Sequence, residues 1–390
     1  MRPIYIAGDN IITSLGFTTS ANMEALMAGR IGIHITSDPH LFPSSLPLSL
    51  VDSGILEEQF MAVLKHYQKK TDSSSFTRLE KFLIISIHDA IKELPYKFQD
   101  QKTLFVLSTT KGNIDLLEER NRALFPHRRI YLWELARIIT DFYGFSNPPL
   151  IISNACVSGI IALMTAFRYL SSGMYDQAIV TGGDILSEFV IAGFQSFQSL
   201  SPTPCRPYDA LRDGLSLGEG AGTMVLTSKM EKSSPIGIKI TGAATSNDAN
   251  HISGPSRTGE ELGFAMLNAM KEANLSPADI GFVNAHGTAT PFNDEMESKA
   301  IALAGLLDTP VNSFKGYWGH TLGAAGMIES VASVQSLRDQ MLIRSAGFES
   351  LGVPEPIHVI ANNEKREITS FLKSASGFGG CNAAIIFEKG

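Results

Sequence analysis

Two glycine-rich segments, Ser216-Leu-Gly-Glu-Gly-Ala-Gly-Thr-Met-Val-Leu-Thr-Ser-Lys229 and Ser376-Gly-Phe-Gly-Gly-Cys-Asn-Ala-Ala-Ile-Ile-Phe-Glu-Lys389, align with each other at an offset of 160 residues. Each is a turn that leads into a short apolar strand. The segments that place Cys156 and His320 before a helix of small residues are separated by nearly the same offset. Chance similarity between short Gly/Ala-rich strings is one explanation. We favour a duplicated chain, joined near Ser233-Ser234-Pro235.

The rest of the chain alternates short apolar runs with amphipathic segments, a pattern typical of α/β proteins with buried, largely parallel sheets. We expect the halves to be residues 1–235, carrying Cys156, and 236–390, carrying His286 and His320. The expected strands lie at Leu104–Leu107, Leu150–Ile152, Ala178–Thr181, Met224–Leu226, Ile236–Ile240, Ile280–Val283 and Ala384–Phe387. The expected helices lie at Glu80–Leu94, Ser158–Leu170, Glu260–Ala273 and Glu295–Ala304.

Composition excludes several classes of protein. The 390 residues are 44% hydrophobic with a formal net charge of -7, so the chain is globular and no global basic field attracts nucleic acid. Three cysteines without a CxxC spacing predict neither a disulfide framework nor a zinc site, and we expect no metal or cofactor. No run approaches the roughly 18 apolar residues of a membrane span, and no signal peptide is recognisable. A cytoplasmic location fits these features.

Cys156 follows an expected strand and begins a helix rich in small residues. A thiol at a helix N-terminus lies at the positive end of the helix dipole, which stabilises the thiolate and lowers the pKa. The alternative is a buried structural cysteine, the commoner state of an isolated cysteine.

Two histidines share this small-residue setting. His286 ends an apolar strand and is followed by Gly-Thr-Ala-Thr-Pro, and His320 lies between Gly319 and the segment Thr321-Leu-Gly-Ala-Ala-Gly326. Sites in α/β sheets assemble at the carboxyl ends of strands, where His286 is expected. A core histidine is the alternative for each. Together with Cys156, the two histidines predict one shared cavity and acyl chemistry on a cysteine.

The chain resembles the elongating, Cys-His-His type of β-ketoacyl-acyl carrier protein synthases, in the thiolase superfamily. The resemblance spans nearly the whole chain in family order. It rests on the segments Gly8–Ile33, Asn154–Gly159, Arg206–Asp209, Arg212–Gly214, Gly218–Gly222, Asn284–Pro291, Lys315–Gly326 and Gly377–Gly380. It implies a thiolase-like fold of two duplicated α/β halves with mixed sheets, packed in α-β-α-β-α layers. It also implies a homodimer or a heterodimer with a related synthase subunit.

The resemblance implies decarboxylative Claisen condensation. Cys156 would hold the acyl group, and His286 and His320 would stabilise the enolate formed from malonyl-acyl carrier protein. The β-ketoacyl-acyl carrier protein product would belong to fatty-acid or polyene/polyketide elongation. Lys315 and Glu329 would form a buried pair that orients the histidines.

The resemblance also assigns the surroundings of the thiol. The backbone N–H groups of Cys156 and Phe378 would form an oxyanion hole, and the Phe378 ring would be the gate of the acyl pocket. Phe314 and Trp318 flank the Lys315–His320 loop, and we expect their rings to line that pocket and to favour unsaturated or aryl-capped acyl groups. Packing of both rings in the core is the alternative.

The carrier protein is acidic, so its docking face should be basic. The resemblance places basic docking residues at Arg78, Arg128, Arg129 and Arg206, with ordinary solvated surface charge as the alternative. Two other functions remain open: a chain-length-setting partner subunit, which would lack the cysteine, and a biosynthetic thiolase, which would use a second cysteine such as Cys381.

Overall fold

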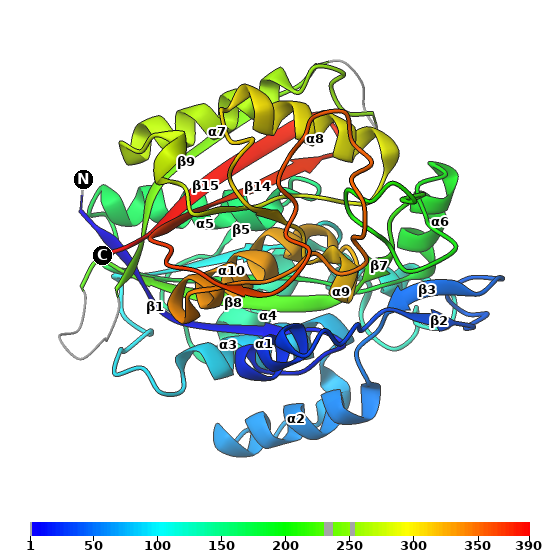
Figure 1. Cartoon of the computed structure of the whole chain (residues 1–390). Coiled ribbons are helices and arrows are strands. Elements are labelled where there is room, and N and C mark those ends of the chain that lie inside the picture. Colours follow the sequence, from blue (N-terminus) through cyan, green and yellow to red (C-terminus); the bar gives the residue numbers. More distant parts are fainter. Residues whose placement is uncertain (1, 230–236, 250–253) are drawn as a thin grey trace.

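The computed structural model describes residues 2–229, 237–249 and 254–390. Its largest sheet has ten strands in the order β11-β10-β14-β15-β9-β1-β8-β6-β4-β5 (Figure 1). The strands before residue 230 are β1 (Ile4–Ile12), β4 (Thr103–Ser108), β5 (Leu150–Ile152), β6 (Gln177–Asp184) and β8 (Gly220–Thr227). The later strands are β9 (Ile238–Asn247), β10 (Phe282–Asn284), β11 (Val311–Asn312), β14 (Ser370–Gly377) and β15 (Cys381–Lys389).

The two halves of this sheet have the same internal order. The series β5-β4-β6-β8-β1 corresponds strand for strand to β11-β10-β14-β15-β9. In both series the first three strands are parallel and the last two run antiparallel to their neighbours. The halves meet where β1 pairs with β9 at Ile4↔Ile240 and Tyr5↔Lys239. The predicted join at Ser233–Pro235 lies outside the described residues.

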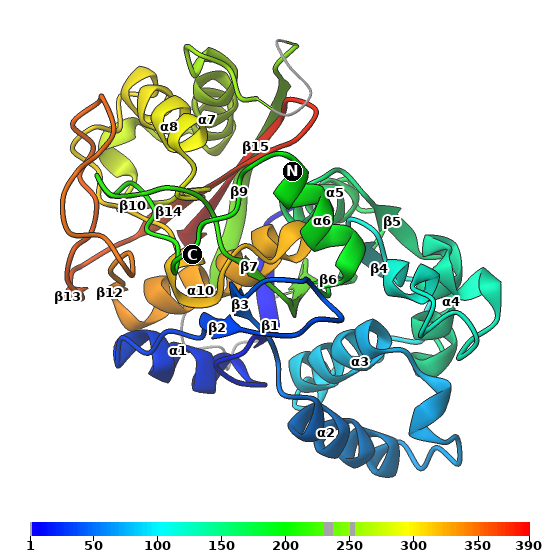
Figure 2. The same cartoon turned by 90° about the vertical axis from the view of Figure 1, so that its right-hand side faces the viewer.

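Helices cover both faces of each half-sheet. They are α1 (Thr19–Met27), α2 (Ser53–His66), α3 (Arg78–Ile91), α4 (Leu132–Tyr143), α5 (Ser158–Ser171), α6 (Glu188–Ser196), α7 (Glu260–Ala273), α8 (Pro291–Leu303), α9 (Lys315–Trp318) and α10 (Ala325–Asp339). α7 and α8 lie above the second half-sheet, α5 and α10 lie between the two, and α3 lies below the first (Figures 1 and 2). The expected α-β-α-β-α layering is thereby confirmed.

Short elements complete the chain. The small strands are β2 (His34–Thr36), β3 (Leu46–Ser49), β7 (Leu217–Gly218), β12 (Met341–Leu342) and β13 (Glu364–Lys365). The 3-10 turns are η1 (Ser73–Ser75), η2 (Ile114–Leu117), η3 (His127–Ile130), η4 (Pro277–Asp279) and η5 (Leu322–Ala324). Within the described ranges, no helix combines the length and the apolar character needed to cross a bilayer.

The middle layer is unusually tight where α5 and α10 begin. A Cβ atom on Gly159 would lie 2.6 Å from the backbone nitrogen of Met327, and one on Gly326 would lie 2.8 Å from that of Ile160. Because glycine occupies both positions, the two helix N-termini approach backbone to backbone. This contact brings the segments just before each helix, around Cys156 and His320, next to each other.

Candidate active site

Cys156 lies in a sharp turn between β5 and α5. Ala155 has a φ of 43°, a left-handed conformation that alanine rarely adopts and that costs on the order of 1–3 kcal/mol. The Ser158 hydroxyl donates to the Ala155 carbonyl at 2.7 Å and accepts from the Asn154 N–H at 2.8 Å. This serine therefore holds both ends of the turn and fixes the position of the thiol, which is 7% exposed.

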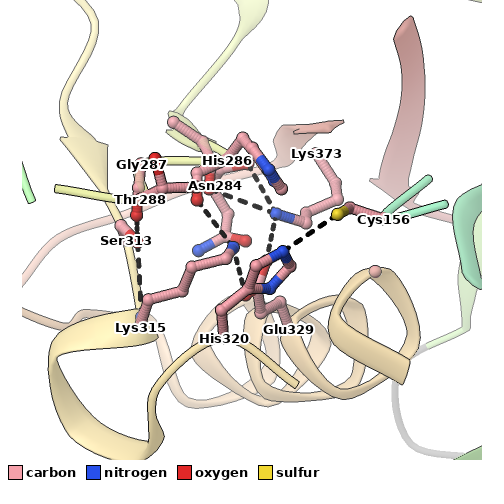
Figure 3. A network of polar contacts seen from close by, with 12 residues as sticks. Cys156, Asn284, His286, Gly287, Thr288, Ser313, Lys315, His320, Glu329 and Lys373 are labelled. Carbon is pink, nitrogen blue, oxygen red and sulfur yellow. Dashed lines mark hydrogen bonds and ion pairs between the residues drawn. The ribbon is translucent and has the colours of Figure 1, made fainter. Parts of the chain in front are cut away.

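Two histidines from the second half converge on this thiol (Figure 3). His320 Nε2 lies 3.0 Å from Cys156 Sγ, and the His286 and His320 rings are 5.3 Å apart at an interplanar angle of 86°. The ligand-type atoms of the three residues all lie within 4.8 Å of one another. All three side chains line one cavity of about 470 Å³.

Burial controls the charge of these three groups. It lowers the pKa of both His286 and His320 well below the usual value, and the Lys315 charge lowers them further, so both imidazoles are neutral. Burial raises the pKa of the Cys156 thiol to about 11, against the opposing charges of Lys315 and Lys111. The expected lowering of the thiol pKa at the helix N-terminus is therefore wrong, because desolvation outweighs it.

The resting site therefore pairs a neutral thiol with a neutral imidazole. The 3.0 Å contact is a hydrogen bond whose direction follows the His320 tautomer: with the ring proton on Nδ1, the thiol S–H donates to Nε2, and with it on Nε2, the ring donates to sulfur. In the first tautomer His320 is placed to take the proton when the sulfur attacks. A shared metal would hold tetrahedral sulfur and nitrogen ligands about 3.5 Å apart, so the shorter contact fits a hydrogen bond better.

Behind the histidines, one carboxylate binds two lysines. Glu329, on α10, is 2.6 Å from Lys315 Nζ through Oε1 and 2.6 Å from Lys373 Nζ through Oε2. All three side chains are at most 1% exposed. Lys315 also donates to the His286 carbonyl at 2.6 Å. Lys315 and Glu329 were expected here from the resemblance, whereas Lys373 was not; its signal in the sequence is a lysine inside the otherwise apolar and small-residue run of β14.

The loop that carries His286 is anchored by carboxylates of α8. Glu297 accepts from the backbone N–H groups of His286 and Gly287, each at 2.7 Å, and from the Tyr208 hydroxyl at 2.6 Å. Asp294 accepts from Thr288 N–H at 2.9 Å. The loop is therefore rigid around His286, and the Arg-Pro-Tyr-Asp segment supports it through Tyr208.

Asp184, at the end of β6, links the two halves beside the site and was also missed. Its carboxylate accepts from the Thr109 hydroxyl at 2.8 Å, from Thr110 N–H at 3.0 Å, and from Gly323 N–H at 2.7 Å. It is 2% exposed. Asp184 thereby ties the loop after β4 to the segment between His320 and α10.

Phe378 lies beside the thiol as expected from the resemblance. Its backbone N–H hydrogen-bonds toward Cys156, which lowers the thiol pKa against the larger effect of burial. Its ring packs 5.7 Å from that of Phe194 and 5.1 Å from that of Phe197, and all three rings line the cavity. The cavity wall next to Cys156 is therefore aromatic.

The expected pocket residues Phe314 and Trp318 occupy the core instead. Both side chains are 0% exposed, their ring centroids are 5.5 Å apart, and neither lines the cavity. Their adjacency to Lys315 in sequence gave no information on which side of α9 faces the substrate. The expected preference for unsaturated or aryl-capped acyl groups, which rested on these rings, loses its basis.

The four expected docking arginines have different surroundings. Arg129 forms an ion pair with Glu80, which is fully buried, and Arg78 forms one with Glu219, which is 2% exposed. These two are internal ion pairs, which corrects the expectation of a free basic surface there. Arg206 is half-buried beside Gly347. Arg128 also forms an ion pair, with the buried Glu134 at 3.0 Å, but its own side chain is 63% exposed.

Cys381 does not join the reactive group. Among the described residues, its sulfur has one hydrogen-bond partner, Asn247 Oδ1 at a long 3.7 Å, and it does not line the cavity. A thiolase would need a second cysteine at the site, so this placement disfavours that alternative. A partner subunit without a nucleophile is disfavoured by Cys156 itself.

Sequence and structure comparisons agree with this geometry. Residues 1–232 match the family described as "Beta-ketoacyl synthase, N-terminal domain" and residues 238–349 match "Beta-ketoacyl synthase, C-terminal domain". The chain is 29% identical to 3-oxoacyl-[acyl-carrier-protein] synthase 2 of Vibrio cholerae, covering 100% of this chain and 99% of that protein. The Staphylococcus aureus protein of the same name is 28% identical, covering 100% and 98%.

A solved structure shares both the fold and some sequence. The ketosynthase ApeO in complex with its chain length factor ApeC, from Xenorhabdus doucetiae, has a TM-score of 0.87 and 26% identity, covering 100% of this chain and 98% of that one. A beta-ketoacyl synthase from Burkholderia phymatum has a TM-score of 0.88 at 24% identity, covering 100% of both chains, which supports the fold.

Proposed function

The chain belongs to the beta-ketoacyl synthase family, and from this premise we propose that Cys156, His286 and His320 carry its condensation reaction. The reaction joins an acyl group to the two-carbon unit of malonyl-acyl carrier protein and releases CO2. The observation that carries the proposal is the 3.0 Å contact between His320 Nε2 and Cys156 Sγ, with His286 in the same cavity.

Acyl transfer begins at the thiol. Cys156 gives its proton to His320 Nε2 and attacks the thioester carbonyl of the acyl-carrier protein. Backbone N–H groups at Cys156 and Phe378 stabilise the oxyanion. The carrier thiolate leaves and takes the proton from His320, which leaves an acyl thioester on Cys156 and a neutral imidazole.

Condensation uses the histidines as donors. Once the sulfur is acylated, neutral His320 exchanges its proton with solvent from Nδ1 to Nε2, and His286 and His320 can then each donate an N–H to the malonyl thioester carbonyl. Loss of CO2 forms an enolate on that carbonyl, where removal of one such donor typically costs about 2.7–4 kcal/mol. The enolate carbon attacks the Cys156 thioester, which releases the β-ketoacyl product and the Cys156 thiolate, and the thiolate takes a proton from solvent.

Separating the two half-reactions tests these roles. Intact mass reports acyl loading of Cys156 from an acyl-carrier protein, and CO2 release from malonyl-carrier protein reports decarboxylation. Cys156→Ala should abolish loading and condensation, whereas His286→Ala should lose decarboxylation and keep most of the loading. His320→Ala should slow both half-reactions, because His320 also takes the thiol proton during loading. If His286→Ala lost loading as fully as Cys156→Ala, the division of roles would be wrong.

We further propose that a second subunit pairs along β5. This strand ends the sheet order, and its residues are only half-buried, so its edge can accept another strand. Trp133 of α4, which packs against β5, is 54% exposed. The Xenorhabdus ketosynthase is described in complex with its chain length factor, which supports an identical or a related chain as the partner. Ile151→Lys should abolish that association, measured as solution mass.

Residues 1–235 and 236–390 are proposed as duplicated halves. The matching strand orders support the duplication.

Carrier-protein docking is proposed at the exposed Arg128. Charge reversal at Arg128 should weaken turnover of carrier-bound substrate and spare a small acyl thioester. Equal loss with both substrates would contradict a docking role.

A further inference from the structure

The second buried lysine of the site has no part in the reaction steps described above. Lys373 lies on β14, is 0% exposed, and donates to Glu329 Oε2 at 2.6 Å, to the Ala285 carbonyl at 3.2 Å and to the Asn284 carbonyl at 3.4 Å. Figure 3 shows its ammonium between Glu329 and the segment that leads to His286. A buried charge is costly unless it is paired, so its retention here needs a reason.

Lys373 and Lys315 together donate hydrogen bonds to three consecutive backbone carbonyls. Lys373 holds those of Asn284 and Ala285, and Lys315 holds that of His286 at 2.6 Å. Asn284 is the last residue of β10, and Ala285 and His286 follow it, so these contacts hold the backbone that carries the His286 imidazole. Two ammoniums on one stretch of backbone fix its position more firmly than one would.

The two lysines also change the charge next to the histidines. The single negative charge of Glu329 forms ion pairs with the ammonium groups of both lysines. The other carboxylate nearby, Glu297 on α8, directs its oxygens to the His286 and Gly287 N–H groups, Tyr208 and Ser374. On the histidine side of the cluster, Lys373 is therefore a second positive charge that Glu329 balances only in part.

We propose that Lys373 is a positioning residue for malonyl decarboxylation: it fixes the backbone of His286 and adds positive charge where the enolate forms. This inference rests on the proposed function. It concerns decarboxylation more than acyl loading, because Lys373 donates to the His286 segment and, among the described residues, forms no hydrogen bond or ion pair with Cys156 or His320.

The proposal has a pH signature. Burial lowers the pKa of Lys373 to about 8, against the raising effect of Glu329, while Lys315 lowers it and Glu297 raises it. Lys373 is therefore charged below about pH 8 and neutral above it. As pH rises through that value the second positive charge disappears, and decarboxylation should fall with an apparent pKa of about 8.

The experiment compares Lys373→Met and Lys373→Arg with the native protein. Lys373→Met keeps the length and removes the charge, and should slow CO2 release from malonyl-carrier protein roughly ten- to hundredfold while acyl loading of Cys156 stays near native. The native decline near pH 8 should be absent from this variant. Lys373→Arg stays charged at all accessible pH, so it should recover much of the rate and also lack the decline. Lys365→Met, an exposed lysine on β13, is the matched control.

Each outcome has a distinct meaning. An unchanged decarboxylation rate in Lys373→Met, or equal loss of loading and decarboxylation, would overturn the inference. If Lys373→Met did not fold, the native pH profile and Lys373→Arg would decide: persistence of the decline near pH 8 in the arginine variant would also overturn it. A native protein that neither loads nor decarboxylates would refute the proposed function itself.

Discussion

Replacing Gly159 with alanine should increase the distance between Cys156 and His320 without changing either residue. A Cβ at this position meets Met327 N at 2.6 Å and Gly323 O at 3.1 Å, whereas ordinary van der Waals contact begins at 3.4 Å. Both atoms are backbone and cannot rotate away, so α5 and α10 must separate by about 0.8 Å at this point. Cys156 lies two residues before α5, and His320 lies two residues before η5, which leads into α10.

The separation should reach the reactive atoms. A shift of that size would lengthen the 3.0 Å Sγ–Nε2 contact to roughly 3.8 Å, where a hydrogen bond to sulfur is long and weak. Overpacking of this kind costs about 1–3 kcal/mol of stability, and a misplacement near 1 Å can lower a rate by about a hundredfold. We therefore expect the Gly159→Ala protein to fold, and its unfolding midpoint to move to a lower denaturant concentration. Because of the displaced thiol, it should load acyl groups roughly tenfold to a hundredfold more slowly.

Acyl loading by intact mass and urea denaturation measure the two effects. Gly193→Ala is the matched control, because a Cβ on Gly193 of α6 meets nothing within 4 Å. That substitution should raise stability by about 0.5–1 kcal/mol through helix propensity and leave the rate unchanged. Native loading and native stability in Gly159→Ala would show that the helix contact does not set the Cys156–His320 distance.

Two further perturbations test how the site is held and how the surface is used. Asp184→Ala removes the acceptor of the Thr109, Thr110 and Gly323 donors, so it should lose about 1–3 kcal/mol of stability in urea denaturation and slow loading; a native value for both would refute the link between the halves. Arg129→Glu leaves Glu80 buried without its cationic partner and should cost about 3–5 kcal/mol, whereas Arg128→Glu should cost less, because its partner Glu134 keeps an ion pair with Arg137. Equal effects of the two arginine substitutions would contradict the distinction between an internal ion pair and an exposed side chain.

The sequence predicted those features that depend on local pattern. Leu150–Ile152 and Glu260–Ala273 match β5 and α7 at both ends, because burial, length and flanking turn residues are local signals. The expected strand Ile280–Val283 starts two residues later, since Ile280 caps the 3-10 turn η4. The small residues beside Cys156 and His320 indicated correctly that backbone approaches closely there.

Contacts between distant segments could not be predicted in this way. Lys373 meets Glu329 across 44 residues, and Asp184 meets Gly323 across 139, and neither spacing leaves a periodic signal. The misassigned arginines have the same cause, because the carboxylate of Glu219 lies 141 residues from Arg78 in sequence. A basic residue can be identified as a surface charge only after its partners in the fold are known.

The structure also explains how a neutral site can stabilise an anion. Burial keeps Cys156, His286 and His320 uncharged at rest, so no ion at the reacting atoms must be desolvated again when substrate arrives. The positive charges lie behind the histidines, on the ammonium groups of Lys315 and Lys373, whose N–H groups donate to Glu329 and to backbone carbonyls. Enolate charge therefore develops against imidazole N–H groups that are already oriented and a positive field that is already in place. This is the arrangement in which electrostatic stabilisation needs least reorganisation during the reaction.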